Sequence, residues 1–191
     1  MPSTLLLVRH AQTALAGTFC GATDPPLDNL GRAQLRDLIE RMAGTPLDAV
    51  YCSDLQRARQ TAEAIAGGAP IHLRPALRQI DFGRWETLTW QQIEQTDPIY
   101  AARWVAEFPN LAPGGGEAIP LFKHRVLREF DFIRQQSAGQ TVAVVTHSTV
   151  LRVLLEELGH FSAHHAWEST RDYTCLLSCT QTSVTSPLNF F

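Results

Sequence analysis

Two short apolar runs, one near each end of the chain, constrain the fold most strongly, because a histidine follows each of them. Residues 4–8 precede Arg9 and His10, and residues 141–145 are followed within two positions by His147. Apolar runs of this length are typical of strands buried within a sheet. In open α/β sheets, ligands bind beyond the carboxyl ends of the strands. The two runs therefore predict a sheet with polar, ligand-binding groups along one edge.

Strands and amphipathic helices alternate along the rest of the chain, which is typical of an α/β domain. Further strands are expected near residues 48–52, 71–73 and 173–178, and helices over about 28–42, 54–66, 119–133 and 150–158. Ser53 or Asp54 is the expected cap of the second helix, and Gly67 and Gly68 are expected to end it. The pattern predicts a three-layer α/β/α sandwich with a mostly parallel central sheet.

Residues 84–117 interrupt the alternation. This segment holds Trp85, Trp90 and Trp104 and ends in a Pro-Gly-Gly-Gly loop. We expect an irregular, cap-like insertion over a ligand site. Its tryptophans are expected mostly to pack in the core or the cap; the alternative is that one or two of them face the site and bind an apolar or aromatic substrate body. With no internal repeat and no linker, residues 1–191 are expected to form a single domain.

Composition excludes several classes of function. Of 191 residues, 45% are hydrophobic and 18% are charged, as expected of a globular domain with a substantial core. A net charge of -3 disfavours nucleic acid and anionic membranes as partners. No segment has the pattern of a membrane span or signal peptide. Cys20, Cys52, Cys175 and Cys179 form no C-x-x-C pair, so we expect mostly buried thiols in a reducing cytoplasm.

The polar groups at the strand ends suit the handling of a phosphoryl group. The Arg9 guanidinium offers a planar fork of N–H donors to an oxyanion. Arg57 lies in the first turn of the helix after residues 48–52, near the same edge of the sheet. His147 precedes a helix N-terminus, whose free N–H groups attract anions. A neutral His10 would attack phosphorus in line, while both arginines and a protonated His147 stabilise the spreading negative charge.

Five segments, in order along the chain, resemble the histidine phosphatase superfamily, which has the phosphoglycerate-mutase-like fold. They are Leu7-Val8-Arg9-His10-Ala11-Gln12-Thr13, Ser53-x-Leu55-x-Arg57-Ala58-x-x-Thr61, Ile80-Asp81-Phe82-Gly83-x-Trp85-Glu86, Pro113-Gly114-Gly115-Gly116-Glu117 and Val144-Val145-Thr146-His147. The resemblance implies that His10 carries a transient phosphohistidine, that Arg9, Arg57 and His147 bind the phosphoryl group, and that no metal or other cofactor takes part. The loop over residues 17–27 resembles that of the α-ribazole phosphatase branch.

Two small departures from the family pattern follow the histidines. Ala11 and Ser148 stand where the family usually has glycine. Both side chains are small, so we expect the site to tolerate them. Ser148 is expected to bind the substrate phosphate together with Arg9 and Arg57.

A larger departure is Gln79, which stands where the family normally has a glutamate that protonates the leaving oxygen. An amide cannot act as a general acid, and loss of such a group typically slows a poor leaving group about 10²- to 10⁴-fold. Asp81 lies two residues further on, on the same side of an extended backbone. We therefore expect Asp81 to replace the missing acid, and Glu86 and Glu117 to serve as hydrogen-bonding or capping residues.

Hydrolysis of a small-molecule phosphomonoester is the favoured function, with α-ribazole 5′-phosphate as a candidate substrate. One alternative is phosphoglycerate mutase, which must hold a second phosphate. The insertion offers it only Arg103, against Glu94, Asp97 and Glu107. The other alternative is a catalytically weakened phosphate-binding protein, for which Gln79 is the support.

Two remaining features point to surfaces rather than to chemistry. His160, His164 and His165 have a spacing that can bind zinc, but no cysteine or carboxylate completes a set, so we expect a surface cluster. The apolar residues 188–191 would suit a partner surface and leave a homodimer open.

Overall fold

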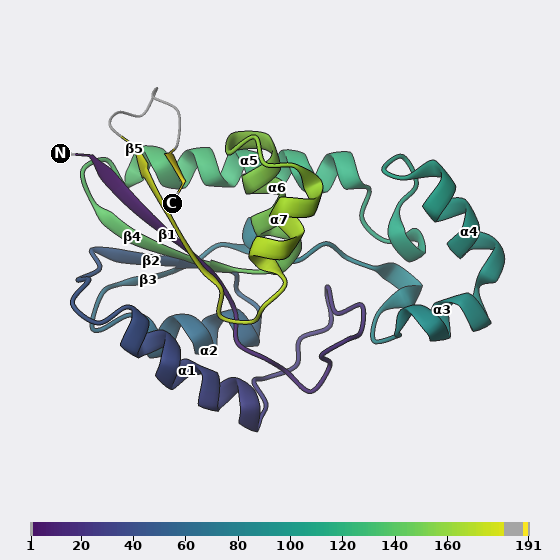
Figure 1. Cartoon of the computed structure of the whole chain (residues 1–191), viewed down its shortest axis with the longest axis horizontal. Helices are drawn as coiled ribbons and strands as arrows, with labels where there is room; N and C mark the ends of the chain where they lie inside the picture. Colours follow the sequence, from purple (N-terminus) through teal and green to yellow (C-terminus); the bar gives the residue numbers. More distant parts are fainter. Residues whose placement is uncertain (1, 182–188, 191) are drawn as a thin grey trace.

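The computed structural model describes residues 2–181 and 189–190, and its described strands form a six-stranded sheet in the order β3-β2-β4-β1-β5-β6 (Figure 1). The strands are β1 (Ser3–Arg9), β2 (Ala49–Cys52), β3 (Ile71–Leu73), β4 (Thr141–Thr146), β5 (Leu176–Gln181) and β6 (Asn189–Phe190). The first four run parallel, and β5 and β6 are antiparallel to their neighbours. The mostly parallel sheet expected from the sequence is confirmed.

The two apolar runs lie side by side in the middle of the sheet. β1 pairs with β4 in a register that sets Val8 against Val145 and Arg9 against Thr146. Because both strands end at the same level, His10 and His147 emerge together at the carboxyl edge of the sheet. The sequence prediction that these groups share one edge is confirmed.

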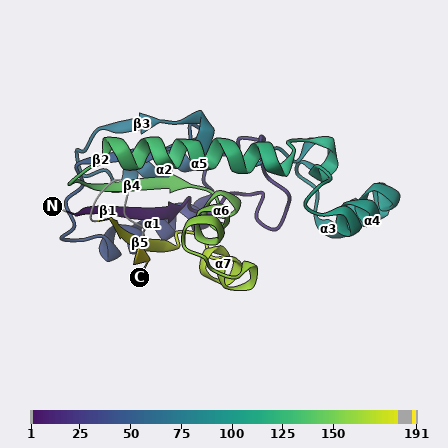
Figure 2. The same cartoon turned by 90° about the horizontal axis from the view of Figure 1, so that it is seen from above.

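Helices cover both faces of the sheet, so the structure has three layers. Leu5 and Leu7 of β1 pack against one helical layer, and Leu6 and Val8 pack against the other. This alternation follows from the two-residue period of a strand. The layers are formed by α5 (Ile119–Gln136) and α6 (Ser148–Leu158) on one face, and by α1 (Asn29–Arg41) and α2 (Gln56–Ile65) on the other. Figure 1 shows α5 above the strands and α1 below them, and Figure 2 looks down on α5 in front of the sheet.

The insertion is more regular than the sequence analysis expected. It contains α3 (Trp90–Thr96) and α4 (Pro98–Glu107), which lie beyond the end of α5 in Figure 1. A capping box starts α3, in which Thr89 and Gln92 satisfy each other's backbone N–H groups. The expectation of irregular structure was wrong here, because short aromatic-rich helices show little apolar periodicity.

Two element boundaries also differ from the sequence analysis. The cap of α2 is Leu55, without a side-chain hydrogen bond, rather than Ser53 or Asp54. Asp54 instead forms an ion pair with Arg78. A helix that the sequence analysis did not predict, α7 (Ala163–Thr170), precedes β5, and β5 therefore begins three residues later than expected.

Within the C-terminal segment, only residues 189 and 190 belong to the described structure. Phe190 packs against the core, with its ring centroid 5.8 Å from that of Phe161. The rest of the apolar segment proposed as a partner surface, residues 188 and 191, lies outside the described residues. No helix in the described part of the chain is both long enough and apolar enough to cross a membrane.

Candidate active site

His10 lies at the end of β1 with one ring nitrogen fixed and the other available. Its Nδ1 lies 2.7 Å from the carbonyl oxygen of Ala11. Because a carbonyl only accepts hydrogen bonds, Nδ1 carries the proton and Nε2 keeps its lone pair. The side chain is only 7% exposed and lines a pocket. The fold therefore presents a neutral imidazole with Nε2 as the potential nucleophile.

Backbone carbonyls hold the two arginines. Arg9 donates to the carbonyl oxygens of Thr170 and Arg171, while its Nε is buried without a partner. Arg57, only 1% exposed, donates to the carbonyl oxygens of Thr23 at 2.7 Å and Gly21 at 2.9 Å. Both guanidiniums line the same pocket as His10. The Asp24 carboxylate lies 4.0 Å from Arg57 Nη1, at the limit of an ion pair. Because the other partners are neutral carbonyls, the two guanidiniums form a preorganised cationic receptor for an incoming anion.

His147 lies immediately before α6 and is fully buried. Its ring centroid is 5.0 Å from that of His10, and its Nε2 lies 2.9 Å from the hydroxyl of Ser53. Its Nδ1 is buried with no hydrogen-bond partner. A buried ring nitrogen without a partner is costly. His147 is not among the residues that line the pocket beside His10, so it lies behind the His10 ring.

Both histidines are neutral in the free protein. Burial lowers the pKa of His10 well below 6.5, and the charges of Arg57 and Arg9 add to that effect. Burial likewise lowers the pKa of His147, again with a contribution from Arg57. The protonated His147 expected from the sequence is therefore disfavoured in the empty site. A bound phosphoryl dianion would act in the opposite direction and favour its protonation.

These lowered pKa values predict that acid destabilises the protein. Below about pH 6.5, the ordinary pKa of histidine, the unfolded chain binds protons that the folded protein excludes, so the free energy of unfolding falls. One pH unit below that value, the loss is about 1 kcal/mol per histidine. Urea unfolding at about pH 7.5 and about pH 5.5 measures it. His147→Gln should lose less stability between the two pH values than the wild type, and an equal loss would contradict the prediction.

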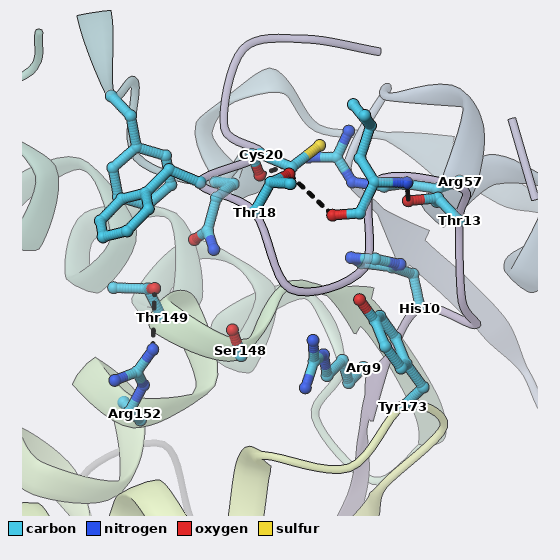
Figure 3. A pocket seen from close by; sticks show the side chains of 14 residues that line it. Arg9, His10, Thr13, Thr18, Cys20, Arg57, Ser148, Thr149, Arg152 and Tyr173 are labelled. Carbon is cyan, nitrogen blue, oxygen red and sulfur yellow. Dashed lines mark hydrogen bonds between the residues drawn. The ribbon is translucent and has the colours of Figure 1, made fainter. Parts of the chain in front are cut away.

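Most of the expected site residues line a single pocket of about 190 Å³. Figure 3 shows His10, Arg9, Arg57 and Ser148 around it, with Ser148 at the start of α6. The lining residues are Arg9, His10, Thr13, Leu15, Thr18, Phe19, Cys20, Arg57, Gln79, Phe82, Ser148, Thr149, Arg152 and Tyr173. No aspartate or glutamate occurs among these described lining residues, so the pocket is cationic.

Asp81 is not brought together with the other expected site residues. Gln79 lines the pocket, whereas Asp81 is exposed and absent from the lining. The Asp81 carboxylate accepts a hydrogen bond from the Gly83 N–H at 2.8 Å. The chain turns here into a short 3₁₀ helix, Gly83–Trp85, so the extended backbone assumed in the sequence analysis ends at this point. The geometry thus gives Asp81 no access to a leaving oxygen.

The other two candidate acids have structural roles, as the sequence analysis expected. Glu86 accepts hydrogen bonds from the N–H groups of Gly21, Ala22, Thr23 and Phe82. Burial alone would raise the pKa of Glu86, but these hydrogen bonds outweigh burial and lower it. Glu117 contacts Arg125 through both carboxylate oxygens, at 2.7 and 2.8 Å.

Several pocket residues were not found from the sequence. The Tyr173 ring lies 4.0 Å from the Arg9 guanidinium carbon, and its hydroxyl points toward the space beside His10 (Figure 3). Burial raises the pKa of Tyr173, so the hydroxyl stays protonated. Thr149 and Arg152 lie one turn apart on α6. Thr149 and Arg152 follow His147 closely on α6, so their proximity to it in the sequence could have indicated them. Tyr173 lies in a loop, and no sequence pattern indicates it.

The three C-terminal histidines do not form a metal site with other described residues. No group of three or more side chains suited to a metal ion lies together in the described part of the chain. His164 is 80% exposed and lies 3.7 Å from Glu168. The surface cluster expected from the sequence agrees with this placement.

Comparison with known proteins identifies the family. The model of the histidine phosphatase superfamily (branch 1) matches residues 5–185. The chain belongs to this superfamily. The adenosylcobalamin/alpha-ribazole phosphatase of Salmonella typhimurium is 32% identical over 175 residues, which cover 90% of this chain and 87% of that protein. Phosphoserine phosphatase 1 of Hydrogenobacter thermophilus is 30% identical over 154 residues, which cover 78% of this chain and 73% of that protein.

A solved structure agrees with this membership. The alpha-ribazole phosphatase of Shigella flexneri superposes with a TM-score of 0.85 at 27% identity, over 97% of this chain and 94% of that one. The histidine phosphatase is therefore an α/β protein of the phosphoglycerate-mutase-like fold and a metal-independent phosphoric monoester hydrolase. The resemblance drawn from the five sequence segments is confirmed.

Proposed function

We propose that this histidine phosphatase hydrolyses a small-molecule phosphomonoester through a phosphohistidine on His10. In the first step, Nε2 attacks phosphorus and the leaving group departs with the electron pair of the broken bond. Arg9, Arg57 and the first N–H groups of α6 beside Ser148 hold the phosphoryl oxygens. His147 becomes protonated as the dianion binds. Water then hydrolyses the phosphohistidine.

The shape of the substrate follows from a second pocket that adjoins the first. This aromatic pocket has a volume of about 330 Å³ and shares four residues with the pocket beside His10, which we call the phosphate pocket. Its apolar lining residues are Phe19, Ile80, Phe82, Trp104, Phe108, Pro113, Ile119, Phe122 and Val153. The buried Nε1 of Trp104 has no hydrogen-bond partner and offers a donor to a ligand. This observation carries the proposal of a phosphate ester with an aromatic or apolar body.

α-Ribazole 5′-phosphate combines those properties, since it joins a phosphorylated sugar to an aromatic base. The relatives with alpha-ribazole phosphatase in their names support it as the substrate. Mutase activity is less well supported. Arg103, the cation considered for a second phosphate, is exposed, forms an ion pair with Glu107 and lines neither pocket.

Steady-state hydrolysis of α-ribazole 5′-phosphate and ribose 5-phosphate tests this assignment, because the two esters differ only in the base. We expect α-ribazole 5′-phosphate to have a kcat/KM at least about 10-fold higher, since burying an aromatic base is worth more than about 1.4 kcal/mol. Trp104→Ala should reduce that preference. Trp167→Ala, which changes an exposed tryptophan on α7, is the matched control.

Equal turnover of the two esters would contradict the α-ribazole assignment, as would much faster turnover of sugar or nucleotide phosphates. Formation of 2-phosphoglycerate from 3-phosphoglycerate without phosphate release would favour the mutase. Binding of esters without any phosphate release would favour the phosphate-binding protein.

Two broader features remain proposals. The four cysteines are free thiols, two of them buried, which supports a reducing cytoplasmic location. A homodimer is also a proposal. Of the apolar C-terminal segment suggested as its interface, Phe190 packs against Phe161 of its own chain, and residues 188 and 191 lie outside the described structure.

A further inference from the structure

The phosphate pocket and the aromatic pocket meet at four shared residues, which we call the junction: Phe19, Phe82, Thr149 and Arg152. Only Thr149 and Arg152 are polar. In Figure 3 they lie on the side of the pocket away from His10, with Ser148 between them and Arg9. A substrate with its phosphate at His10 and its body in the aromatic pocket must cross the junction. The ester oxygen of such a substrate would then lie near these two side chains.

Residues at the junction are placed to act on the leaving oxygen, because phosphoryl transfer proceeds in line. The attacking and leaving atoms lie on opposite sides of phosphorus. With Nε2 of His10 on one side, the leaving oxygen faces the opposite side of the pocket, toward the junction. None of the described residues that line this pocket is a carboxylic acid. Stabilisation of the leaving oxygen must then come from hydrogen-bond donors.

Arg152 is a partly buried cation that forms no ion pair with a described residue, and the nearby charge of Glu156 on the same helix offsets only part of its desolvation. Its Nη2 donates to the Thr149 hydroxyl at 3.3 Å, and its Nε is buried without any hydrogen-bond partner. Burial lowers the pKa of Arg152, and the charge of Arg9 adds to this effect. No carboxylate of the described chain forms an ion pair with it. Negative charge that develops at the junction would stabilise this guanidinium.

The Thr149 hydroxyl is arranged to donate into the junction. A hydroxyl has one donor and two acceptor positions, so accepting from Arg152 leaves its own proton available. Hydrogen bonds in a chain polarise one another, and a cationic donor strengthens the effect. Thr149 therefore offers a stronger hydrogen bond to an oxyanion than an isolated threonine would.

We propose that Thr149 donates a hydrogen bond to the leaving oxygen and that Arg152 polarises Thr149. The inference rests on the proposed phosphoryl transfer to His10. As Nε2 forms the new bond to phosphorus, the electron pair of the breaking bond passes to the leaving oxygen, which departs as an oxyanion held by Thr149. Water then attacks the phosphohistidine, restores His10 and supplies the proton that the oxyanion takes up. Ester and water thus give alcohol and phosphate.

This arrangement predicts a dependence on the leaving group that a structural role would not produce. A hydrogen bond from Thr149 should accelerate the reaction little when the leaving group is a good one, as in p-nitrophenyl phosphate. It should accelerate the reaction most when the leaving group is a phenol or alcohol of high pKa. Removing one donor to a developing oxyanion typically costs about 10²- to 10³-fold in an enclosed site, and about 10- to 100-fold is expected in this more open one.

The test is kcat/KM for a series of aryl phosphates of increasing phenol pKa, together with phenethyl phosphate. Thr149→Val and Arg152→Met should lower kcat/KM for phenethyl phosphate about 10- to 100-fold and steepen its dependence on leaving-group pKa. Circular dichroism reports whether the variants are folded, and their loss for p-nitrophenyl phosphate should be smaller than their loss for phenethyl phosphate. Thr149→Ser, which keeps the hydroxyl, should retain the wild-type slope. Arg128→Met, an exposed arginine on α5, is the matched control.

An unchanged slope in active variants overturns this inference while leaving the proposed function intact. An equal loss for every ester assigns Thr149 and Arg152 a structural role and also overturns it. A change confined to the KM of substrates with an anionic body would make Arg152 a recognition residue instead. Failure of the wild type to hydrolyse any ester overturns the proposed function, and with it this inference.

Discussion

Replacing His10 by alanine is expected to reduce phosphate release from p-nitrophenyl phosphate by at least about 10³-fold. The substitution removes the proposed nucleophile, and we expect no second covalent route at this site, since His147 is fully buried and its Nε2 contacts Ser53. p-Nitrophenolate leaves without protonation, so the amide at position 79 does not mask the chemistry. Phosphate release at neutral pH, with EDTA present throughout, is the measurement.

His124→Ala is the matched control for this loss, because His124 is an exposed histidine on α5. That variant should keep the wild-type rate. Circular dichroism of His10→Ala should show the wild-type fold, since the His10 ring bonds to the carbonyl of the adjacent Ala11 and does not tie distant segments together through that hydrogen bond. Substantial activity in folded His10→Ala would show that another group attacks phosphorus.

Replacing Gln79 by glutamate is expected to raise the turnover of alkyl phosphates about 10²-fold or more. Gln79 lines the phosphate pocket, so a carboxyl group there reaches the reacting centre. The side-chain oxygen of Gln79 lies 3.3 Å from its neighbour's N–H, so a carboxylate fits the same position. A phosphoryl dianion nearby would raise the pKa of the new carboxyl and keep it protonated for donation. Hydrolysis of p-nitrophenyl phosphate should change little.

Asp81→Asn tests whether Asp81 is the proton donor in the wild type. Because Asp81 is exposed and bonded to Gly83, we expect its loss to leave alkyl phosphate turnover and the pH profile unchanged. A large decrease would instead restore Asp81 as the proton donor. If the wild type only binds alkyl esters and Gln79→Glu begins to hydrolyse them, the protein is a weakened enzyme that keeps its phosphate site.

The central sheet and the candidate phosphate site could be predicted from the sequence because both depend on local patterns. An apolar run identifies a buried strand, and the residue after it lies at the sheet edge wherever the strand pairs. His10, His147 and Arg9 were placed at that edge in this way, and Arg57 by its position in the first turn of the following helix; the structure brings these four candidates close together. Helix amphipathicity likewise located α1 and α5 to within a few residues.

The leaving-group side of the site could not be predicted, because it depends on how distant segments pack. Asp81 was assigned by counting two residues along an extended strand, but the chain turns into a 3₁₀ helix at Gly83. The turn is held by close backbone packing: a Cβ on Gly114 would lie 2.1 Å from the carbonyl oxygen of Phe82. Tyr173 comes from a loop remote in sequence. These contacts have no periodic signal.

Detection of the covalent intermediate tests the account most directly. The enzyme is mixed with p-nitrophenyl phosphate, quenched rapidly in alkali to preserve phosphohistidine, and digested for mass spectrometry. We predict one added phosphoryl group on the peptide that contains His10, formed and lost at rates compatible with turnover, and absent from His10→Ala. A phosphoryl group on a different residue, or turnover with no phosphoenzyme under conditions where its breakdown is slowed, would contradict the central role of His10.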